Sequence, residues 1–159
     1  MKMHGKKIEG PNVETVVIPR SDPSPDLVFK AAAVLDYDEF EAILPAPEPP
    51  IIVRPGGEQT KNIDDPKYLE KVSSYGDKRT HWMILTSLKA TDGLEFETVK
   101  MSDPETWINY REEMKAAGLS PFEVSKVIGA VIDACGLNQV KIDEATKRFL
   151  AGQVATPNV

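Results

Sequence analysis

The clearest pattern of apolar and polar positions along the chain lies between Ser120 and Gly136. Ser120 can cap a helix, Pro121 suits its first position, and Glu123 can complete a capping box. Gly136 can adopt the left-handed conformation that ends a helix. Between them, apolar residues recur at the spacing of one helix face: Val124, Val127, Ile128, Val131, Ile132 and Cys135. The pattern predicts a helix whose apolar face lies in the core.

Two further helices are predicted on either side of this one. Asp103 and Pro104 open a helix that ends at Gly118, with an apolar face made by Trp107, Tyr110, Met114 and Ala117. Asn138 caps a last helix that ends at Gly152, with an apolar stripe made by Ile142, Ala145, Phe149 and Leu150. Because joints of about two residues connect these helices, we expect neighbouring helices to pack on each other.

The longest predicted helix begins at Asp65 and Pro66 and runs to about Ala90. One of its faces carries Tyr68, Val72, Tyr75, Arg79 and Trp82. Residues 82–85 are apolar on every side, so the end of this helix is expected to be buried all round. We expect residues 65–152 to carry the main core, with four side chains largely buried: Trp107, Val127, Val131 and Phe149.

The first part of the chain predicts short extended segments. Residues 13–18 are rich in β-branched side chains, and residues 26–34 form a second strand candidate, so we expect a hairpin-like antiparallel pair. Asp36 is placed to cap a short helix, where Leu35 and Phe40 are spaced to form a hydrophobic staple.

Proline is concentrated in the first 66 residues, which hold most of the 13 prolines of the chain. The run at residues 45–50 disfavours both a helix and a sheet ladder and predicts an extended polyproline II segment. Residues 51–53 then predict a short strand or buried anchor, and residues 54–64 a polar loop or the end of a hairpin.

These elements together predict an α+β fold. A small N-terminal antiparallel β-hairpin or sheet is followed by a mainly helical bundle of about four helices. The length of 159 residues predicts a single domain, with a β-rich part at residues 12–64 and a helical part at residues 65–152. Residues 1–11 and 153–159 are expected to be flexible tails.

Composition narrows the classes of protein that remain. The net charge of −6 offers no basic field for a phosphate backbone, so we expect no nucleic-acid partner. The single cysteine excludes an internal disulfide and a cysteine-cluster zinc site. No stretch approaches the roughly 20 apolar residues of a membrane span, and the first residues do not resemble a signal peptide, so we expect a cytosolic protein with no membrane partner.

Candidate chemistry is sparse. His4 and His81 are isolated in sequence, and Cys135 lies on the apolar stripe of a helix without a histidine near it. The acidic residues between Asp36 and Glu41 lack the glycine and the ligand spacing of a calcium loop. We therefore expect no catalytic residue, no metal site and no cofactor, and we interpret the chain as a non-enzymatic protein.

The order of several motifs is informative as a set. Residues 18–20 read Ile-Pro-Arg, and residues 26–31 and 34–37 follow as Asp-Leu-Val-Phe-Lys-Ala and Val-Leu-Asp-Tyr. Further motifs are the proline run, Asp65-Pro66-Lys67-Tyr68, residues 82–88, Asp103-Pro104-Glu105-Thr106-Trp107, Ala117-Gly118-Leu119-Ser120, and residues 149–153. In this order the chain resembles the tail assembly chaperone family of long-tailed (siphovirus-type) bacteriophages, over roughly residues 13–153. These motifs are structural signatures, and none is catalytic.

The resemblance implies a protein that binds the tape measure protein and keeps it soluble while the tail tube polymerises around it. It also implies contact with the tail tube protein and self-association as further expectations. Such a chaperone acts in the host cytoplasm and is absent from the mature virion. The family often produces a longer product by frameshifting.

A surface for such a partner can be predicted on the helices. We expect a groove between the long helix and the last helix, edged by Tyr75, Trp82 and Leu150, with Arg79 and Arg148 at its rim. Core packing is the ordinary use of aromatic residues such as Trp82, and an interface is the alternative. Two other functions stay open: a structural virion component, such as a tail or head–tail connector subunit, and a small enzyme with an unrecognised site.

Overall fold

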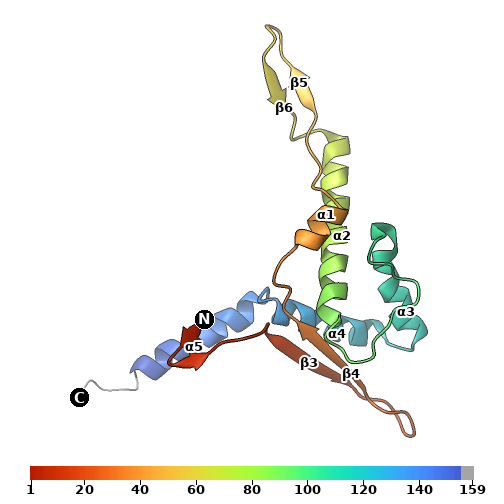
Figure 1. The fold of residues 1–159 in the computed structure, drawn as a ribbon, viewed down its shortest axis with the longest axis vertical. Helices are drawn as coiled ribbons and strands as arrows, with labels where there is room; N and C mark the ends of the chain where they lie inside the picture. The colour runs from red at the N-terminus through yellow and green to blue at the C-terminus, as the bar shows by residue number, and fades with distance from the viewer. Residues whose placement is uncertain (155–159) are drawn as a thin grey trace. The chain divides into compact units, whose positions relative to one another are not determined.

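The computed structural model describes residues 1–154 and has the expected α+β fold, with small antiparallel sheets and several helices (Figure 1). The chain divides into two compact units, and each is assembled from stretches that are separate in sequence. Of the described residues, the first unit holds 1–34, 87–94 and 119–154. The second unit holds residues 35–86 and 95–118. This division does not follow the predicted boundary between a β-rich and a helical part.

The first unit is built on one antiparallel hairpin. Strand β3 (Val13–Ile18) pairs with β4 (Leu27–Ala32), so that Val13 lies opposite Ala32 and Ile18 opposite Leu27. The prediction of this hairpin is confirmed. Because side chains alternate between the faces of a strand, one face is buried and includes Ile18, Phe29 and Ala31, and the other stays exposed.

Helix α4 (Pro121–Ala134) packs against both strands of this hairpin. Val127 and Val131 are fully buried there, as the apolar stripe predicts. The helix ends in a Schellman motif: Gly136 has a φ of 70°, and the backbone N–H of Leu137 donates to the carbonyl oxygen of Ile132 at 3.0 Å. A non-glycine residue at position 136 would be strained.

Residues 87–94 lie along the edge of β4 in the same unit. The Thr91 hydroxyl accepts a hydrogen bond from the Lys30 N–H at 2.9 Å and donates one to the Lys30 carbonyl oxygen at 2.9 Å. The Ser87 hydroxyl donates to the Ala32 carbonyl oxygen at 2.7 Å. The side chains of Thr91 and Ser87 therefore form hydrogen bonds with the backbone groups of β4 that would otherwise be available to a third strand.

The second unit has an aromatic core. It contains α1 (Asp38–Ile43), most of α2 (Pro66–Leu88), the 3₁₀ helix η1 (Pro104–Asn109) and α3 (Tyr110–Ala116). Phe40 of α1 is fully buried, and its ring centroid lies 5.3–5.9 Å from those of Tyr75, Trp82 and Trp107. Such tilted aromatic pairs are each worth about 1 kcal/mol beyond the area that they bury.

The starts of α2 and η1 follow the sequence signals, but that of α1 does not, because its N-cap is Tyr37, without a side-chain cap hydrogen bond, rather than the predicted Asp36. The Asp65 carboxylate accepts the N–H of Tyr68 at 2.9 Å, as predicted for the cap of α2. The expected staple at α1 is wrong, because Leu35 is 76% exposed while Phe40 is buried. Phe40 packs against the aromatic rings of α2 and η1 instead, so tertiary contacts outweigh the local motif.

Two small hairpins complete the β structure. Strand β5 (Ile51–Val53) pairs with β6 (Gln59–Lys61) in a two-stranded ribbon, and all three residues of β5 are exposed. Strand β1 (Lys2–Met3) pairs with β2 (Lys6–Lys7) inside the segment predicted as a loose tail. His4 and Gly5 join β1 to β2 with φ values of 50° and 76°, as a tight hairpin turn requires.

The last helix, α5 (Gln139–Val154), belongs to the first unit and differs most from expectation. Every side chain from Gln139 to Gln153 is exposed. The predicted burial of Phe149 is wrong, because 63% of this residue is exposed. The predicted burial of Trp107, Val127 and Val131 is confirmed. The spacing of apolar residues identifies a stripe on a helix, but it does not determine which element covers it.

The end of α5 also differs from the expected position. Gly152 lies within the helix rather than at its end, since the helix continues to Val154. A single glycine inside a helix costs about 1 kcal/mol relative to alanine, which the remaining hydrogen bonds of the helix can tolerate. Most of the segment predicted to fray, residues 155–159, lies outside the described residues.

Replacing Val131 by aspartate tests the core of the first unit. Val131→Asp leaves an unpaired carboxylate beneath the hairpin, and we expect a loss of about 3–5 kcal/mol of stability or aggregation. Val140→Asp on the exposed start of α5 is the matched control and should melt within about 2 °C of the wild type. Thermal unfolding followed by circular dichroism measures both. An unchanged melting temperature for Val131→Asp would contradict the core assignment.

Candidate functional site

Three of the predicted partner-binding residues lie on α2 in the second unit. Trp82 is 2% exposed, and its ring lies 5.4 Å from that of Tyr37. The Arg79 guanidinium lies 4.3 Å from the centroid of the Tyr37 ring on its way to solvent. Tyr75 is half-buried against Phe40. Trp82 is therefore a core residue, whereas Tyr75 and Arg79 reach the surface.

The other two predicted residues, Arg148 and Leu150, are exposed on α5 of the first unit. The groove predicted between α2 and α5 thus draws on residues of two units, and it stays a prediction. Within each unit, the structure brings together a different surface. One lies on α5, and the other lies between α2 and the proline-rich segment.

The surface on α5 is an uncovered apolar stripe. Ile142 and Phe149 share one side of this helix, with Ala145 between them and Leu150 beside them, and all four are exposed. Val140 is also exposed, but at helical spacing it lies on the opposite side. This stripe is the part of the first unit best suited to pack against another apolar helix.

The first turn of α5 is held to α4 by polar contacts, although the apolar stripe of α5 is exposed. The Asn138 side chain donates to the Asp133 carboxylate at 2.8 Å, and Lys141 forms an ion pair with the same carboxylate at 2.5 Å. The hydrogen bond from Lys141, followed by that from Asn138, holds the pKa of Asp133 below its ordinary value. These contacts join the first turn of α5 to the last turn of α4.

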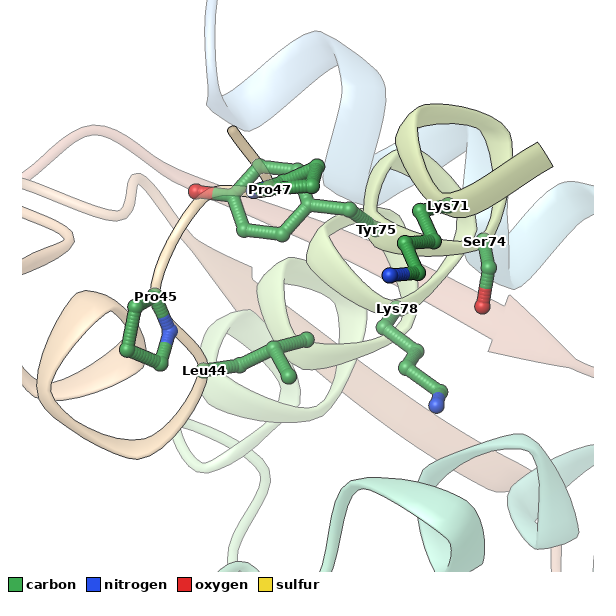
Figure 2. A pocket seen from close by; sticks show the side chains of 7 residues that line it. All are labelled: Leu44, Pro45, Pro47, Lys71, Ser74, Tyr75 and Lys78. Carbon is green, nitrogen blue, oxygen red and sulfur yellow. The ribbon is translucent and has the colours of Figure 1, made fainter. Parts of the chain in front are cut away.

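The second surface is a groove between α2 and the proline-rich segment that follows α1. Its first hollow has a volume of about 230 Å³. Figure 2 shows the Tyr75 ring of α2 lying beside Pro47 of the extended segment. Lining residues are Leu44, Pro45, Pro47, Lys71, Ser74, Tyr75 and Lys78. A second hollow, of about 310 Å³, is lined by Glu48, Pro50, Asp65, Lys67, Tyr68 and Lys71. Lys71 borders both hollows, which therefore follow each other along α2.

Sequence reasoning missed this groove. The proline run was predicted to be an extended polyproline II segment, and the lysines of α2 were not among the residues predicted to bind a partner. Lys67, Lys71 and Lys78 recur at helical spacing in the sequence, which is a usable signal of one charged side. No sequence pattern, however, indicated that residues 44–50 would lie along that side.

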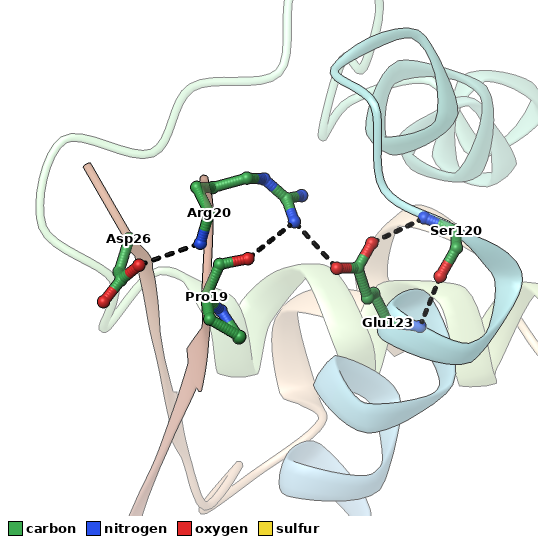
Figure 3. A network of polar contacts seen from close by, with 5 residues as sticks. All are labelled: Pro19, Arg20, Asp26, Ser120 and Glu123. Carbon is green, nitrogen blue, oxygen red and sulfur yellow. Dashed lines mark hydrogen bonds and ion pairs between the residues drawn. The ribbon is translucent and has the colours of Figure 1, made fainter. Parts of the chain in front are cut away.

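Arg20 and Glu123 form a polar network that could be mistaken for a functional site (Figure 3). Glu123 accepts from the Ser120 N–H at 2.8 Å, while the Ser120 hydroxyl accepts from the Glu123 N–H at 3.3 Å. Arg20 donates to Glu123 at 2.7 Å and to the Pro19 carbonyl oxygen at 3.2 Å. The Ser120 backbone hydrogen bond, and then the one from Arg20, lower the pKa of Glu123.

This network is structural. It is the predicted capping box of α4, extended by an ion pair that ties the end of β3 to the start of the helix. One oxygen of its carboxylate accepts from Arg20 and the other from the Ser120 N–H, so both oxygens are engaged in holding the helix cap.

His81 lies in the second unit, with its ring centroid 5.7 Å from that of Tyr110. Burial lowers its pKa, the nearby Arg111 lowers it further, and Asp77 acts in the opposite direction. The imidazole is thus neutral at neutral pH. Within residues 1–154 no group of three or more histidine, cysteine, aspartate or glutamate side chains is placed to hold a metal ion.

Comparison of the chain with protein-family models, with curated proteins and with solved structures gives no match. Within residues 1–154, every helix is too short or too polar to cross a lipid bilayer. The two surfaces described above both present apolar side chains: Ile142, Phe149 and Leu150 on α5, and Leu44, Pro45 and Pro47 beside α2.

His81 predicts a pH dependence of stability. Because its folded-state pKa lies below the ordinary 6.5, the unfolded chain binds the proton first as the pH falls. Its contribution to stability is complete above about pH 6.5 and is lost as the pH falls through the folded-state pKa. His81→Gln should flatten the dependence of the unfolding free energy on pH between about pH 7 and pH 5.5, measured by urea denaturation. Equal slopes for the wild type and His81→Gln would contradict the prediction.

Proposed function

We propose that this protein is a phage tail assembly chaperone that binds the tape measure protein and keeps it soluble until the tail tube polymerises around it. The observation that carries the proposal is the uncovered apolar stripe of α5, which includes Ile142, Phe149 and Leu150. The order of sequence motifs that resembles this family supports it independently.

Before assembly, a tape measure chain needs a partner that covers its apolar faces. A long chain with amphipathic helical segments aggregates if its apolar faces stay exposed before assembly. A helix with an open apolar stripe can pair with such a segment, because each covers the apolar face of the other. The contacts between Asp133 and the start of α5 hold this stripe at a defined place in the first unit.

The size of the stripe favours a reversible contact. A few apolar side chains on one helix provide modest affinity per copy, which suits a chaperone that must leave as the tube grows. Many copies bound along one tape measure chain add avidity. The proposal places this binding in the host cytoplasm, with self-association and contact with the tail tube protein as accompanying features.

A structural virion component is the second candidate, and the β5–β6 ribbon favours it. An isolated two-stranded ribbon is marginally stable, and Ile51, Ile52 and Val53 are all exposed on this one. Subunits that add such a ribbon to the sheet of a neighbour would bury these side chains on assembly. Mass spectrometry of purified particles separates the candidates, because a chaperone is absent from the mature virion and a tail or connector subunit is present.

Co-expression with tape measure fragments tests the chaperone proposal. We expect helical, apolar fragments to stay soluble with the wild-type protein and to precipitate without it. Phe149→Asp places a charge in the stripe of α5 and should reduce the soluble fraction of the fragment at least fivefold. Val140→Asp is the matched control, since it puts the same charge on the opposite side of the same exposed helix. Densitometry of soluble and insoluble fractions gives the measurement.

Three outcomes would count against the proposal. Fragments covering the whole tape measure protein would be equally soluble with and without the chaperone, or Phe149→Asp and Val140→Asp would protect them equally well. Stoichiometric recovery of the protein from purified virions would instead favour the virion component. Because Phe149 is exposed, circular dichroism should find both variants folded, so loss of activity cannot be assigned to unfolding.

A further inference from the structure

The groove of the second unit has one apolar wall and one cationic edge. Leu44, Pro45 and Pro47 form the wall from the extended segment, and Tyr75 contributes an aromatic surface from α2 (Figure 2). Lys71 and Lys78 carry the ammonium groups of the edge. An occupant must therefore offer apolar side chains and negative charge together.

The charge at the first hollow is unbalanced. Its lining residues include Lys71 and Lys78 but no aspartate or glutamate, in a chain whose net charge is −6. Lys78 pairs with Glu105, whose side chain is 78% exposed, so this pair is weak and a second carboxylate can compete for the ammonium group. The ion pairs of the described residues do not involve Lys71.

The second hollow is electrically balanced. Lys67 and Lys71 lie there with Glu48 and Asp65. Negative charge on an occupant is thus favoured at the Lys71–Lys78 end of the groove, and a neutral or basic residue at the end near Asp65. The two ends of the groove therefore differ in charge. Such a difference suits an extended chain, whose residues also differ along its length, rather than a symmetric ion.

The dimensions favour an extended peptide. From Asp65 to Lys78 the helix rises by about 20 Å, which corresponds to roughly six extended residues. Hollows of about 230 and 310 Å³ lie at or below the lower end of small-ligand pockets, so each accepts one or two side chains. The prolines of the wall lack N–H donors, so a bound chain is recognised through its side chains rather than by strand pairing.

We propose that this groove binds an extended acidic segment of another protein, with apolar side chains in the hollows and a carboxylate between Lys71 and Lys78. The site is separate from the α5 stripe and does not rest on the proposed chaperone function. Charge complementarity gives it selectivity for acidic over neutral segments, and raised salt weakens it.

Nuclear magnetic resonance titration of the full-length ¹⁵N-labelled protein tests the proposal. The probe is a synthetic capped hexapeptide in which leucine alternates with a polar residue, with glutamate at the two polar positions towards one end and glutamine at the third, and its counterpart has glutamine in place of each glutamate. We expect saturable shifts of the amides of Leu44, Glu48 and residues 67–78, and binding at least tenfold weaker for the glutamine peptide. Salt should weaken the binding of the acidic peptide and leave that of the neutral one unchanged.

Two variants locate the charge that matters. Lys71→Glu should weaken binding of the acidic peptide at least tenfold, and Lys71→Gln should give a smaller loss, because both remove the ammonium group but only the first adds a repulsive charge. Lys115→Glu, on the exposed surface of α3 in the same unit, makes the same charge change outside the groove and should bind like the wild type. Thermal unfolding checks that each exposed substitution leaves the fold intact.

The proposal is overturned by any of three results. The acidic and glutamine peptides bind equally well or neither binds, the shifted amides lie outside the groove, or Lys71→Glu and Lys115→Glu weaken binding equally. The last result would mean that net charge alone attracts the peptide.

Discussion

The burial of the apolar face of α4 beneath the β3–β4 hairpin is the contact on which the first unit depends. Val127 and Val131 supply the buried surface, and Arg20 joins the end of β3 to the cap of the helix through Glu123. Because α4 is held at both ends, the joint at Gly136 sets where α5 begins. The surface of α5 that we propose for a partner is therefore positioned by the buried core of the first unit.

The core of the second unit is made mainly of aromatic side chains, unlike that of the first unit. Its core gathers aromatic rings around Phe40, and Trp82 and Trp107 lie within this cluster. Aromatic residues fill space with few rotatable bonds, so they define the positions of short elements such as α1. The segment after α1 leaves this core along α2, and the groove exists because its prolines keep it extended.

The functional proposals share one physical basis, which is surface that the chain leaves uncovered. Phe149 on α5 and Ile52 on β5 are exposed apolar residues in elements that pack against little else. Lys71 is an exposed cation beside an apolar wall. Such surfaces suit a protein whose partners are other polypeptides, since each becomes more favourable when a second chain excludes water from it.

Most of the local elements and the α+β class could be predicted from the amino-acid sequence, whereas the β1–β2 hairpin was not. Helix caps can be recognised in the sequence because they depend on residues within one turn. Examples are Ser120 with Glu123 at α4 and Asp65 at α2. The burial of Val127 and Val131 was also predictable, because a wide apolar stripe on a central helix has to be covered.

Which apolar stripes are covered depends on how the elements pack, and this could be read from the three-dimensional structure alone. The stripes of α4 and α5 both recur at helical spacing in the sequence, yet the hairpin covers one and Phe149 of the other stays exposed. The tertiary structure also decided that Phe40 joins an aromatic cluster rather than a staple with Leu35, and that prolines near Lys71 form the wall of a groove. Periodicity records the spacing of side chains along one element, whereas burial and grooves depend on contacts between residues far apart in the chain.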